Sequence, residues 1–571
     1  AGLPKAPSHY NPIVNPKRAK TRQLYVLRRM HELGHIPTQE FKETGEQPLR
    51  IKRKSQEFPI RAEYVAEMVR QAVYDRYQEE TYIRGFKVYT TVRQLDQQAA
   101  YQSLRQGVMD YDRRRGYRGP EAVVDLPKNG ANQEEALENV VQDMIDSDDI
   151  YAAVVLTADS KSVHAYRRGG ENIEITGDGL KFAHKFLADT VAASQQRIRP
   201  GALIRVQKNE KDAWQIVQLP QVEASLVSID PQDGAIRALV GGFDFNRNQF
   251  NHVTQAWRQP GSSLKPFIYS AALEKGFTPA TVINDAPLSF SAAETGSKLW
   301  EPRNFDGKYE GPLRMREALA KSKNMVSIRI LQAIGVQYAQ DYISRFGFDP
   351  SMHPPYMTMA LGAGSVTPMQ MAVGYTTFAN GGFRIAPYFI ERIEDEKGNV
   401  LEQAQPARVT KNAAQVIDPR NAFLMTNMMQ DVVERGTATR AKQLSRTDLA
   451  GKTGTTNDHI DAWFCGYQAN LVAVAWIGFD NPRSLGDNET GGRAALPIWM
   501  GYMSKVLQNV PMAIYTLPRG VTMTRINPVT GLREAHGAMT EYFLQEQLPP
   551  EASRDDDDVA KPSGDVPDRL L

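Results

Sequence analysis

The stretch GSSLK (261–265) of this 571-residue chain is a Ser-x-x-Lys motif at the predicted start of a helix. Residues three apart share one face of a helix, so a helix opening here would bring the Ser262 hydroxyl close to the Lys265 amine. A serine becomes a nucleophile when a nearby base takes its proton, and a lysine is such a base once burial or another cation lowers its pKa. A helix N-terminus also supplies free N–H groups for a developing oxyanion. Alone the motif is weak, because a capped helix with an exposed lysine explains it equally well.

Two further polar motifs follow in the chain. SKN (322–324) comes after the helical run RMREALAK (314–321), and KTG (452–454) lies in the strand-like run LAGKTGTT (449–456). Each has an ordinary explanation, a helix cap for SKN and a strand that ends in a turn for KTG. A glycine on such a strand also lets a substrate backbone approach and pair with the strand edge. In this order the three motifs are far more specific than any one of them, and they match the pattern of β-lactamases and penicillin-binding proteins.

Strand-like runs flank the three motifs. ASLVSI (224–229) and AIRALV (235–240), joined by a short turn, form a predicted hairpin before the first motif. Helical segments fill 262–450, and AWFCGY (462–467) and LVAVAWI (471–477) follow the KTG run as two more strands. Strands at both ends with helices between them predict a domain of the α/β (α+β) class, with an antiparallel sheet flanked by helices.

The upstream part of the chain has a different pattern. Residues 119–220 combine short strands with frequent turns, which is typical of a small β-barrel module. The strands expected there are AAVVL (152–156), NIEI (172–175), LIRV (203–206) and WQIV (214–217). Before this module we expect a helix at 64–69, a strand at 86–92 and a helix at 95–111.

Composition excludes some classes of protein. The net charge is only +2, which argues against a general nucleic-acid binder. The single cysteine, Cys465, rules out an internal disulfide, and its apolar neighbours predict a buried small side chain. No run of 18 apolar residues is present that could span a membrane. The tail from 516 is Pro-rich and carries DDDD (555–558), so we expect much of it to be extended or mobile.

With these motifs in place, the chain resembles the class A penicillin-binding proteins, of the 1A type found in Gram-negative bacteria. The matching segments are RQPGSSLKPF (258–267), ALGAGSVTP (360–368), TFANGG (377–382), RGT (435–437) and DAWF (461–464). The opening AGLPKAPS (1–8) resembles the last motif of the family's glycosyltransferase domain. The resemblance implies a multidomain chain with a remnant of that domain (1–45), a linker region (46–118), an OB-like module (119–220), a transpeptidase domain (221–515) and a C-terminal extension (516–571).

The resemblance also implies catalytic roles. In this family the first serine of Ser-x-x-Lys is the acyl acceptor, which makes Ser262 the expected nucleophile, and Lys265 the expected general base. Ser322 is expected to relay a proton toward the leaving amine, while Lys452 keeps the surrounding field positive. No metal or cofactor is expected to take part.

Substrate-binding roles follow in the same way. Asn324 is expected to bind the peptide amide of the donor. The hydroxyls of Thr453 and Thr455 are expected to bind its terminal carboxylate, with Gly454 between them on the strand. The backbone N–H groups of Ser262 and Thr455 would form the oxyanion hole.

The implied reaction crosslinks peptidoglycan. Ser262 would attack the D-Ala-D-Ala peptide of one stem, release D-Ala, and pass the acyl group to an amine of a second stem. Stem peptides, glycan strands and β-lactam antibiotics, which mimic D-Ala-D-Ala, are therefore the expected ligands. A D,D-carboxypeptidase or slow β-lactamase is one alternative, and a non-catalytic β-lactam-binding scaffold is another. The middle residue Lys323 of SKN, where β-lactamases commonly have Asp, and the lack of a suitably placed Glu-x-x-x-Asn segment both argue against hydrolysis.

One departure concerns the glycosyltransferase. The family's catalytic Glu-Asp-x-x-Phe motif is absent from this sequence. We therefore expect the parent protein, but not this chain, to polymerise lipid II, on the periplasmic side of the inner membrane and behind an N-terminal anchor. An outer-membrane lipoprotein activator that binds 119–220 is a further hypothesis from the resemblance.

A rival motif lies near the N-terminus. HELGH (31–35) has the spacing of a zinc protease, which requires both histidines on one helix. Gly34 favours helix termination and Pro37 disfavours a helical Ile36, so we expect His35 to lie beyond the helix end and no zinc site to form.

Overall fold

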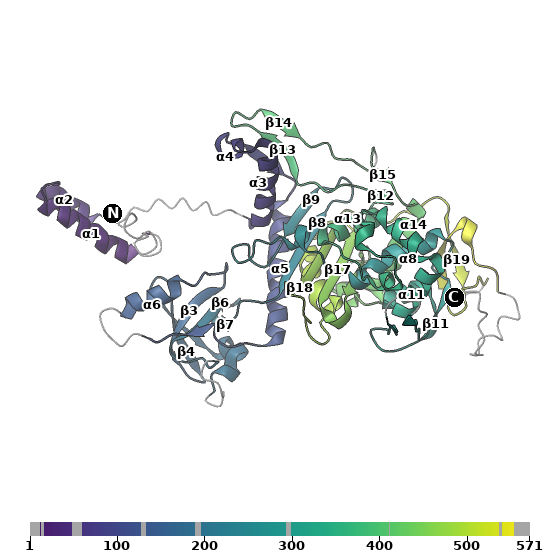
Figure 1. The fold of residues 1–571 in the computed structure, drawn as a ribbon, viewed down its shortest axis with the longest axis horizontal. Coiled ribbons are helices and arrows are strands. Elements are labelled where there is room, and N and C mark those ends of the chain that lie inside the picture. The colour runs from purple at the N-terminus through teal and green to yellow at the C-terminus, as the bar shows by residue number, and fades with distance from the viewer. Residues whose placement is uncertain are drawn as a thin grey trace. The chain divides into compact units, whose positions relative to one another are not determined.

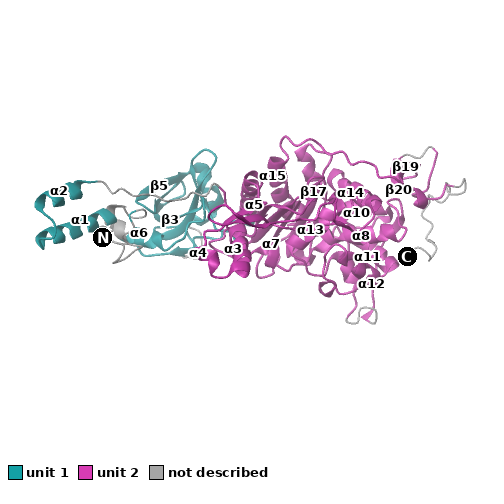
Figure 2. Ribbon diagram, turned by 90° about the horizontal axis from the view of Figure 1, so that it is seen from above, with its two compact units in different colours: residues 1–59, 112–220 teal, residues 60–111, 221–571 magenta. Residues whose placement is uncertain are grey.

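The structure, a computed structural model, describes residues 12, 16–47, 60–126, 133–188, 196–292, 298–409, 411–535 and 539–552. The chain divides into two compact units, which Figure 2 colours separately. Unit 1 comprises Ala1–Pro59 with Asp112–Pro220, and unit 2 comprises Ile60–Tyr111 with Gln221–Leu571. The region 46–118, expected as a linker, is thus divided between them.

Two helices precede the β-rich part of unit 1. They are α1 (Pro16–Glu32) and α2 (Thr38–Glu46). Gly34 adopts a left-handed φ of 75°, and the helix has already ended at Glu32, so His35 lies outside it as predicted. His31 instead contacts the Thr38 hydroxyl at 2.9 Å. The described residues contain no group of three or more His, Cys, Asp or Glu side chains that could hold a metal ion.

The β-rich part of unit 1 is a six-stranded sheet in the order β2-β6-β3-β4-β5, with β7 paired to β6. Its elements are β2 (Ala122–Val123), α6 (Gln133–Gln142), β3 (Tyr151–Ala158), β4 (Ser162–Arg167), β5 (Glu171–Thr176), β6 (Ala202–Lys208) and β7 (Trp214–Val217). Alternate residues such as Ile173 and Ile175, or Ile204 and Val206, fill one hydrophobic core, as the two-residue period of a strand requires. The four predicted strands are confirmed, while β4 was not predicted because polar residues interrupt SVHAYR (162–167).

Unit 2 is built on a five-stranded antiparallel sheet in the order β16-β17-β18-β8-β9 (Figure 1). The strands are β8 (Glu223–Ile229), β9 (Ile236–Val240), β16 (Ala450–Thr455), β17 (Asp461–Gln468) and β18 (Leu471–Gly478). Every residue of β17 and β18 is buried, including Cys465, because helices pack on both faces of the sheet. The predicted hairpin and the three later strands are confirmed, and the antiparallel pairing of β18 with β8 joins the two ends of the domain.

Helices surround this sheet and carry the first two motifs. They are α7 (His252–Gln255), α8 (Lys265–Glu274), α10 (Met315–Lys321), α11 (Asn324–Ile334), α12 (Val336–Ser344), α13 (Pro368–Ala379), α14 (Pro419–Glu434) and α15 (Leu496–Val506). Residues 265–273 of α8 are all buried. The ring of Phe267, on this helix, contacts Phe346, Phe348 and Phe378, so a packed aromatic cluster fixes the helix that carries Lys265.

Residues 60–111 belong to unit 2. They form α3 (Glu63–Tyr77), α4 (Glu80–Ile83), β1 (Lys87–Thr90) and most of α5 (Gln94–Arg115), and they confirm the two helices and the strand predicted there. The strand β1 pairs with β13 (Ile390–Glu394), which pairs with β14 (Val400–Gln403). Smaller two-stranded sheets join β10 (Val282–Asp285) to β11 (Gly311–Arg314), and β12 (Phe383–Arg384) to β15 (Ala414–Gln415).

No helix among the described residues is long and apolar enough to cross a membrane.

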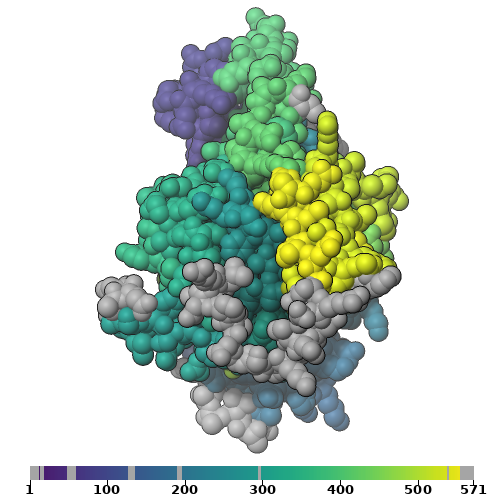
Figure 3. Space-filling view, turned by 90° about the vertical axis from the view of Figure 1, so that its right-hand side faces the viewer, coloured from purple at the N-terminus to yellow at the C-terminus, as the bar shows by residue number. Residues whose placement is uncertain are grey.

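Part of the C-terminal segment, much of which we expected to be extended or mobile, is packed against the rest of unit 2. Strands β19 (Val521–Ile526) and β20 (Met539–Leu544) pair as a hairpin, drawn in yellow against the rest of the unit in Figure 3. Ile526 and Phe543 pack with Ala280, and the Pro-rich composition of the segment did not predict these contacts. The DDDD run (555–558) lies outside the described residues.

Candidate active site

The GSSLK motif opens a helix as predicted, although its first turn is a 3-10 turn rather than an α-helical one. A 3-10 segment (Gly261–Leu264) leads directly into α8, whose first residue is Lys265. The two serines of the motif differ in their surroundings. Ser263 is fully buried, and its hydroxyl donates a hydrogen bond of 2.6 Å to the Pro260 carbonyl, whereas Ser262 is only half-buried. Ser262 is therefore the serine whose hydroxyl is available to a substrate.

The KTG strand lies directly against this turn. A Cβ atom at Gly454 would be 2.5 Å from the Pro260 carbonyl oxygen and 2.9 Å from Ser263 Oγ. A Cβ at Gly261, whose φ is +54°, would be 2.6 Å from the Thr455 carbonyl oxygen. The glycine of KTG is thus needed for the close approach of strand and turn, a packing role that the sequence did not reveal.

Lys265 is fully buried and points toward the SKN motif. Its Nζ donates hydrogen bonds of 2.8 Å to the Ser322 carbonyl and 2.8 Å to Asn324 Oδ1, and it lies 3.4 Å from Ser322 Oγ. Burial lowers the pKa of Lys265 well below the ordinary lysine range, and the positive charge of Lys452 lowers it further, while Asp285 acts in the opposite direction. This environment favours the neutral amine that a general base requires.

Lys452 approaches Ser322 from the opposite side. Its ammonium, also fully buried, donates to Ser322 Oγ at 2.8 Å and to the Thr453 carbonyl at 3.0 Å. Burial lowers the pKa of Lys452 to about 7. One hydroxyl therefore links two buried amines, and it can pass a proton between them by accepting from one and donating to the other.

Ser322 is held in an unusual backbone conformation. It caps the C-terminus of α10 in the left-handed region, with φ 59° and ψ 39°. Such a conformation is costly for a residue with a side chain and is found preferentially at functional sites. Here it places the Ser322 hydroxyl between Lys265 and Lys452.

The hydroxyls expected to bind a carboxylate have partners that the sequence did not reveal. Thr453 Oγ1 lies 2.6 Å from Thr437 Oγ1, and Thr455 Oγ1 accepts a hydrogen bond of 3.0 Å from the Gly491 N–H. Thr437 ends the RGT segment (435–437), which was noticed only as part of the resemblance. It joins the site because its backbone N–H also donates to the Ala320 carbonyl of α10, at 3.1 Å.

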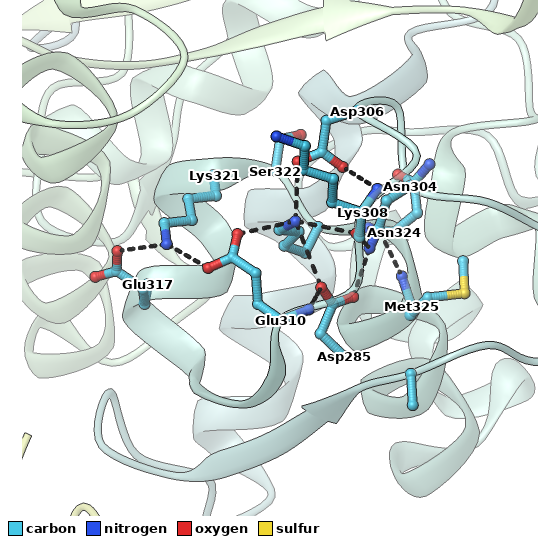
Figure 4. Close-up of polar contacts among 12 residues, drawn as sticks. Asp285, Asn304, Asp306, Lys308, Glu310, Glu317, Lys321, Ser322, Asn324 and Met325 are labelled. Carbon is cyan, nitrogen blue, oxygen red and sulfur yellow. Dashed lines mark hydrogen bonds and ion pairs between the residues drawn. The ribbon is translucent and has the colours of Figure 1, made fainter. Parts of the chain in front are cut away.

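A charge cluster around the buried ammonium of Lys323 adjoins the SKN motif (Figure 4). The ammonium of Lys323 lies 3.0 Å from carboxylate oxygens of Asp306 and Glu310, and 3.4 Å from Asp285. Its side chain is only 2% exposed. Sequence analysis noted Lys323 only as a departure from β-lactamases. Its acidic partners were not predicted, because Asp285 ends β10 while Asp306 and Glu310 lie on the connection between β10 and β11.

Comparisons with known proteins agree with this architecture. A family model described as the penicillin binding protein transpeptidase domain matches residues 224–498. A second, described as the penicillin-binding protein OB-like domain, matches residues 117–222. All three motifs lie inside the first match, and the six-stranded sheet of unit 1 lies inside the second.

Whole-chain similarity is equally clear. The chain is 48% identical over 522 residues to penicillin-binding protein 1A of Neisseria lactamica, covering 91% of this chain and 65% of that protein. It is 42% identical over 603 residues to penicillin-binding protein 1A of Pseudomonas aeruginosa, covering 96% and 73% respectively. The crystal structure of penicillin-binding protein 1A from Haemophilus influenzae superposes with a TM-score of 0.85 at 34% identity, covering 97% of this chain and 86% of that one. The chain spans about two thirds of the Neisseria relative, and it belongs to the penicillin-binding protein 1A family.

Proposed function

We propose that this protein is a serine-type D,D-transpeptidase that crosslinks peptidoglycan stem peptides. The observation that carries the proposal is the convergence of three motifs on one hydroxyl. The side-chain nitrogens of Lys265 and Lys452 both reach Ser322, and the half-buried Ser262 lies in the turn that leads into Lys265. This is the arrangement of a nucleophile, a base and a proton relay.

In the first step, Ser262 Oγ attacks the carbonyl carbon of the penultimate D-Ala, and its proton passes to the neutral amine of Lys265. The tetrahedral intermediate would be stabilised by the backbone N–H groups of Ser262 and Thr455. Its collapse breaks the peptide bond and expels the terminal D-Ala, whose amine takes up a proton through the Ser322 hydroxyl. The products are an ester on Ser262 and free D-Ala.

In the second step, the amine of another stem attacks this ester. The amine loses a proton to the lysine–serine relay, Ser262 Oγ regains one, and a new peptide bond joins the stems.

Thr453 and Thr455 would hold the carboxylate of the donor in the first step. The short contact between Thr453 and Thr437 supports this role by orienting the Thr453 hydroxyl.

Hydrolysis of the acyl-enzyme is the competing outcome. Lys323, which stands where β-lactamases commonly have an aspartate, is occupied by three carboxylates and is buried. The pKa of Lys323 is raised among these carboxylates, so its amine stays protonated and would not act as the base for a deacylating water.

The partition between the two outcomes can be measured directly. A D-Ala-D-Ala pentapeptide is incubated with the protein at increasing concentrations of an acceptor stem amine, and D-Ala, hydrolysed donor and crosslinked dimer are quantified by mass. We expect dimer to replace hydrolysed donor as acceptor rises, and both to be lost in Ser262→Ala. D-Ala release with hydrolysed donor alone at every acceptor concentration would identify a carboxypeptidase.

Location and partners extend this proposal. We infer that the protein acts on the periplasmic face of the inner membrane, where stem peptides, glycan strands and β-lactams would be its ligands. Anchoring, lipid II polymerisation by the parent protein and an outer-membrane lipoprotein activator bound to 119–220 remain predictions from the resemblance.

A further inference from the structure

Helix α11 begins at Asn324, and the residue that precedes it in the sequence does not cap its N-terminus. The residue at its N-cap position, Lys323, makes no side-chain capping bond. The first free N–H groups of the helix are satisfied instead by Asn304, whose Oδ1 accepts from the Asn324 N–H at 2.8 Å and from the Met325 N–H at 3.3 Å. Asn304 is therefore the cap of α11, supplied by the β10–β11 connection (Figure 4).

The other half of the Asn304 amide is anchored by Asp285, the buried carboxylate of the charge cluster. Its Nδ2 donates to Asp285 Oδ1 at 2.6 Å and to the Lys308 carbonyl at 2.8 Å. Asp285 is completely buried and also accepts from the Glu310 N–H at 3.0 Å. Asn304 is itself only 4% exposed, so both ends of its amide are fixed by partners within the protein.

The same connection fixes the side chain of Asn324. Asn324 Nδ2 donates to the Arg303 carbonyl at 2.8 Å, which leaves Oδ1 facing the ammonium of Lys265. Residues 303 and 304 thus hold both the backbone and the amide of Asn324. A continuous path of hydrogen bonds leads from Asp285 through Asn304 and Asn324 to Lys265.

We propose that Asn304 is a positioning residue of the active site. Anchored by Asp285, it sets the start of α11 and thereby holds Asn324 and the amine of Lys265 in the geometry needed for acylation of Ser262. The inference rests on the proposed function, because it assigns Asn304 a part in that reaction. Asn304 lies outside all three motifs, and its role follows only from the contacts described above.

Asp285 allows a second test, because its charge should influence the pH dependence of acylation in a way that mere support of the fold would not. The charged groups that face Lys265 are Lys452 from β16 and Asp285 from β10, with the neutral Ser322 and Asn324 completing its surroundings. The carboxylate of Asp285 favours the protonated form of Lys265. Replacing it by the isosteric asparagine removes that charge, so the amine becomes neutral at lower pH.

The test measures the acylation rate with a fluorescent penicillin in a stopped-flow instrument, as a function of penicillin concentration and pH. The variants are Asn304→Ala, Asn304→Ser and Asp285→Asn. Asn284→Ala is the matched control, since Asn284 is the exposed neighbour of Asp285 on β10. We expect Asn304→Ala to lower the limiting acylation rate on the order of tenfold or more, the size of one lost buried hydrogen bond, with little change in penicillin affinity.

Asp285→Asn should move the rising limb of the pH–rate profile to lower pH, and Asn284→Ala should match the wild type. If Asn304→Ala fails to fold in a thermal melt, Asn304→Ser, which keeps a hydroxyl acceptor, gives the deciding rate. A wild-type limiting rate in the folded Asn304 variant would overturn the positioning role, and an unmoved profile in Asp285→Asn would overturn the electrostatic influence of Asp285 on Lys265. Absence of acylation in the wild type would instead overturn the proposed function.

Discussion

Lys452 Nζ lies 2.8 Å from Ser322 Oγ, although 130 residues separate the two in the chain. The contact requires the strand β16 to lie beside the end of α10, and it joins the second motif to the third. Because Lys265 reaches the same serine from α8, Ser322 is the point at which all three motifs meet. The geometry of the site therefore depends on this junction more than on any single residue.

Burial of Lys452 predicts a pH-dependent stability. Its pKa is about 7 in the folded protein against an ordinary 10.5, so between these values the unfolded chain holds a proton that the folded chain has released. The free energy of unfolding should therefore rise with pH across this window. In Lys452→Met, urea unfolding at pH about 7 and about 10 should show a smaller rise than in the wild type. An identical rise in both proteins would contradict the buried, depressed lysine.

Removing the Ser322 hydroxyl should separate catalysis from folding. Ser322→Ala keeps the backbone but breaks the link between the two lysines, so we expect the limiting acylation rate to fall by about 10²–10⁴-fold. The melting temperature should change little, which a thermal scan on the same sample checks. An unaltered acylation rate would exclude Ser322 as the proton relay.

Thr437 should influence binding rather than bond formation. Thr437→Val preserves the shape of the side chain but removes the hydroxyl 2.6 Å from Thr453 Oγ1. We expect the dissociation constant for a carboxylate-bearing β-lactam to rise about tenfold, at an unchanged limiting acylation rate. Thr439→Val, at an exposed position two residues on, is the control and should bind like the wild type.

The C-terminal hairpin should be part of the folding unit. Glu541 of β20 is 1% exposed and forms a salt bridge with the buried Arg316 at the start of α10, whereas Glu546, just beyond β20, is 53% exposed in its pair with Arg420. Glu541→Gln should therefore lower the free energy of unfolding by about 3 kcal/mol or more, because the buried arginine loses the negative charge that pairs with it. Glu546→Gln should cost less than about 1 kcal/mol. Equal effects in urea titrations would show that the hairpin is not integral.

The sequence was sufficient for features that depend on local pattern. The strands around KTG and the helix that ends before His35 follow from periodicity, turns and Gly34. The three motifs could be placed in one site because their order matches a known family. Contacts between distant segments could not be predicted, since nothing local to Asn304, Thr437 or Glu541 distinguishes them from ordinary polar residues. Each acquires its role only when the fold brings a helix end, a hydroxyl or a buried arginine to it.

The most direct test asks which of two adjacent serines, Ser262 or Ser263, is acylated by a penicillin. Wild type, Ser262→Ala and Ser263→Ala are each incubated with a fluorescent penicillin, and the adduct is counted by intact mass and located by peptide mapping over several hours. We predict one stable adduct on Ser262 in the wild type, none in Ser262→Ala, and a retained adduct in a folded Ser263→Ala. An adduct that persists in Ser262→Ala, or that maps to another residue in the wild type, would contradict the assignment of the nucleophile and the mechanism built on it.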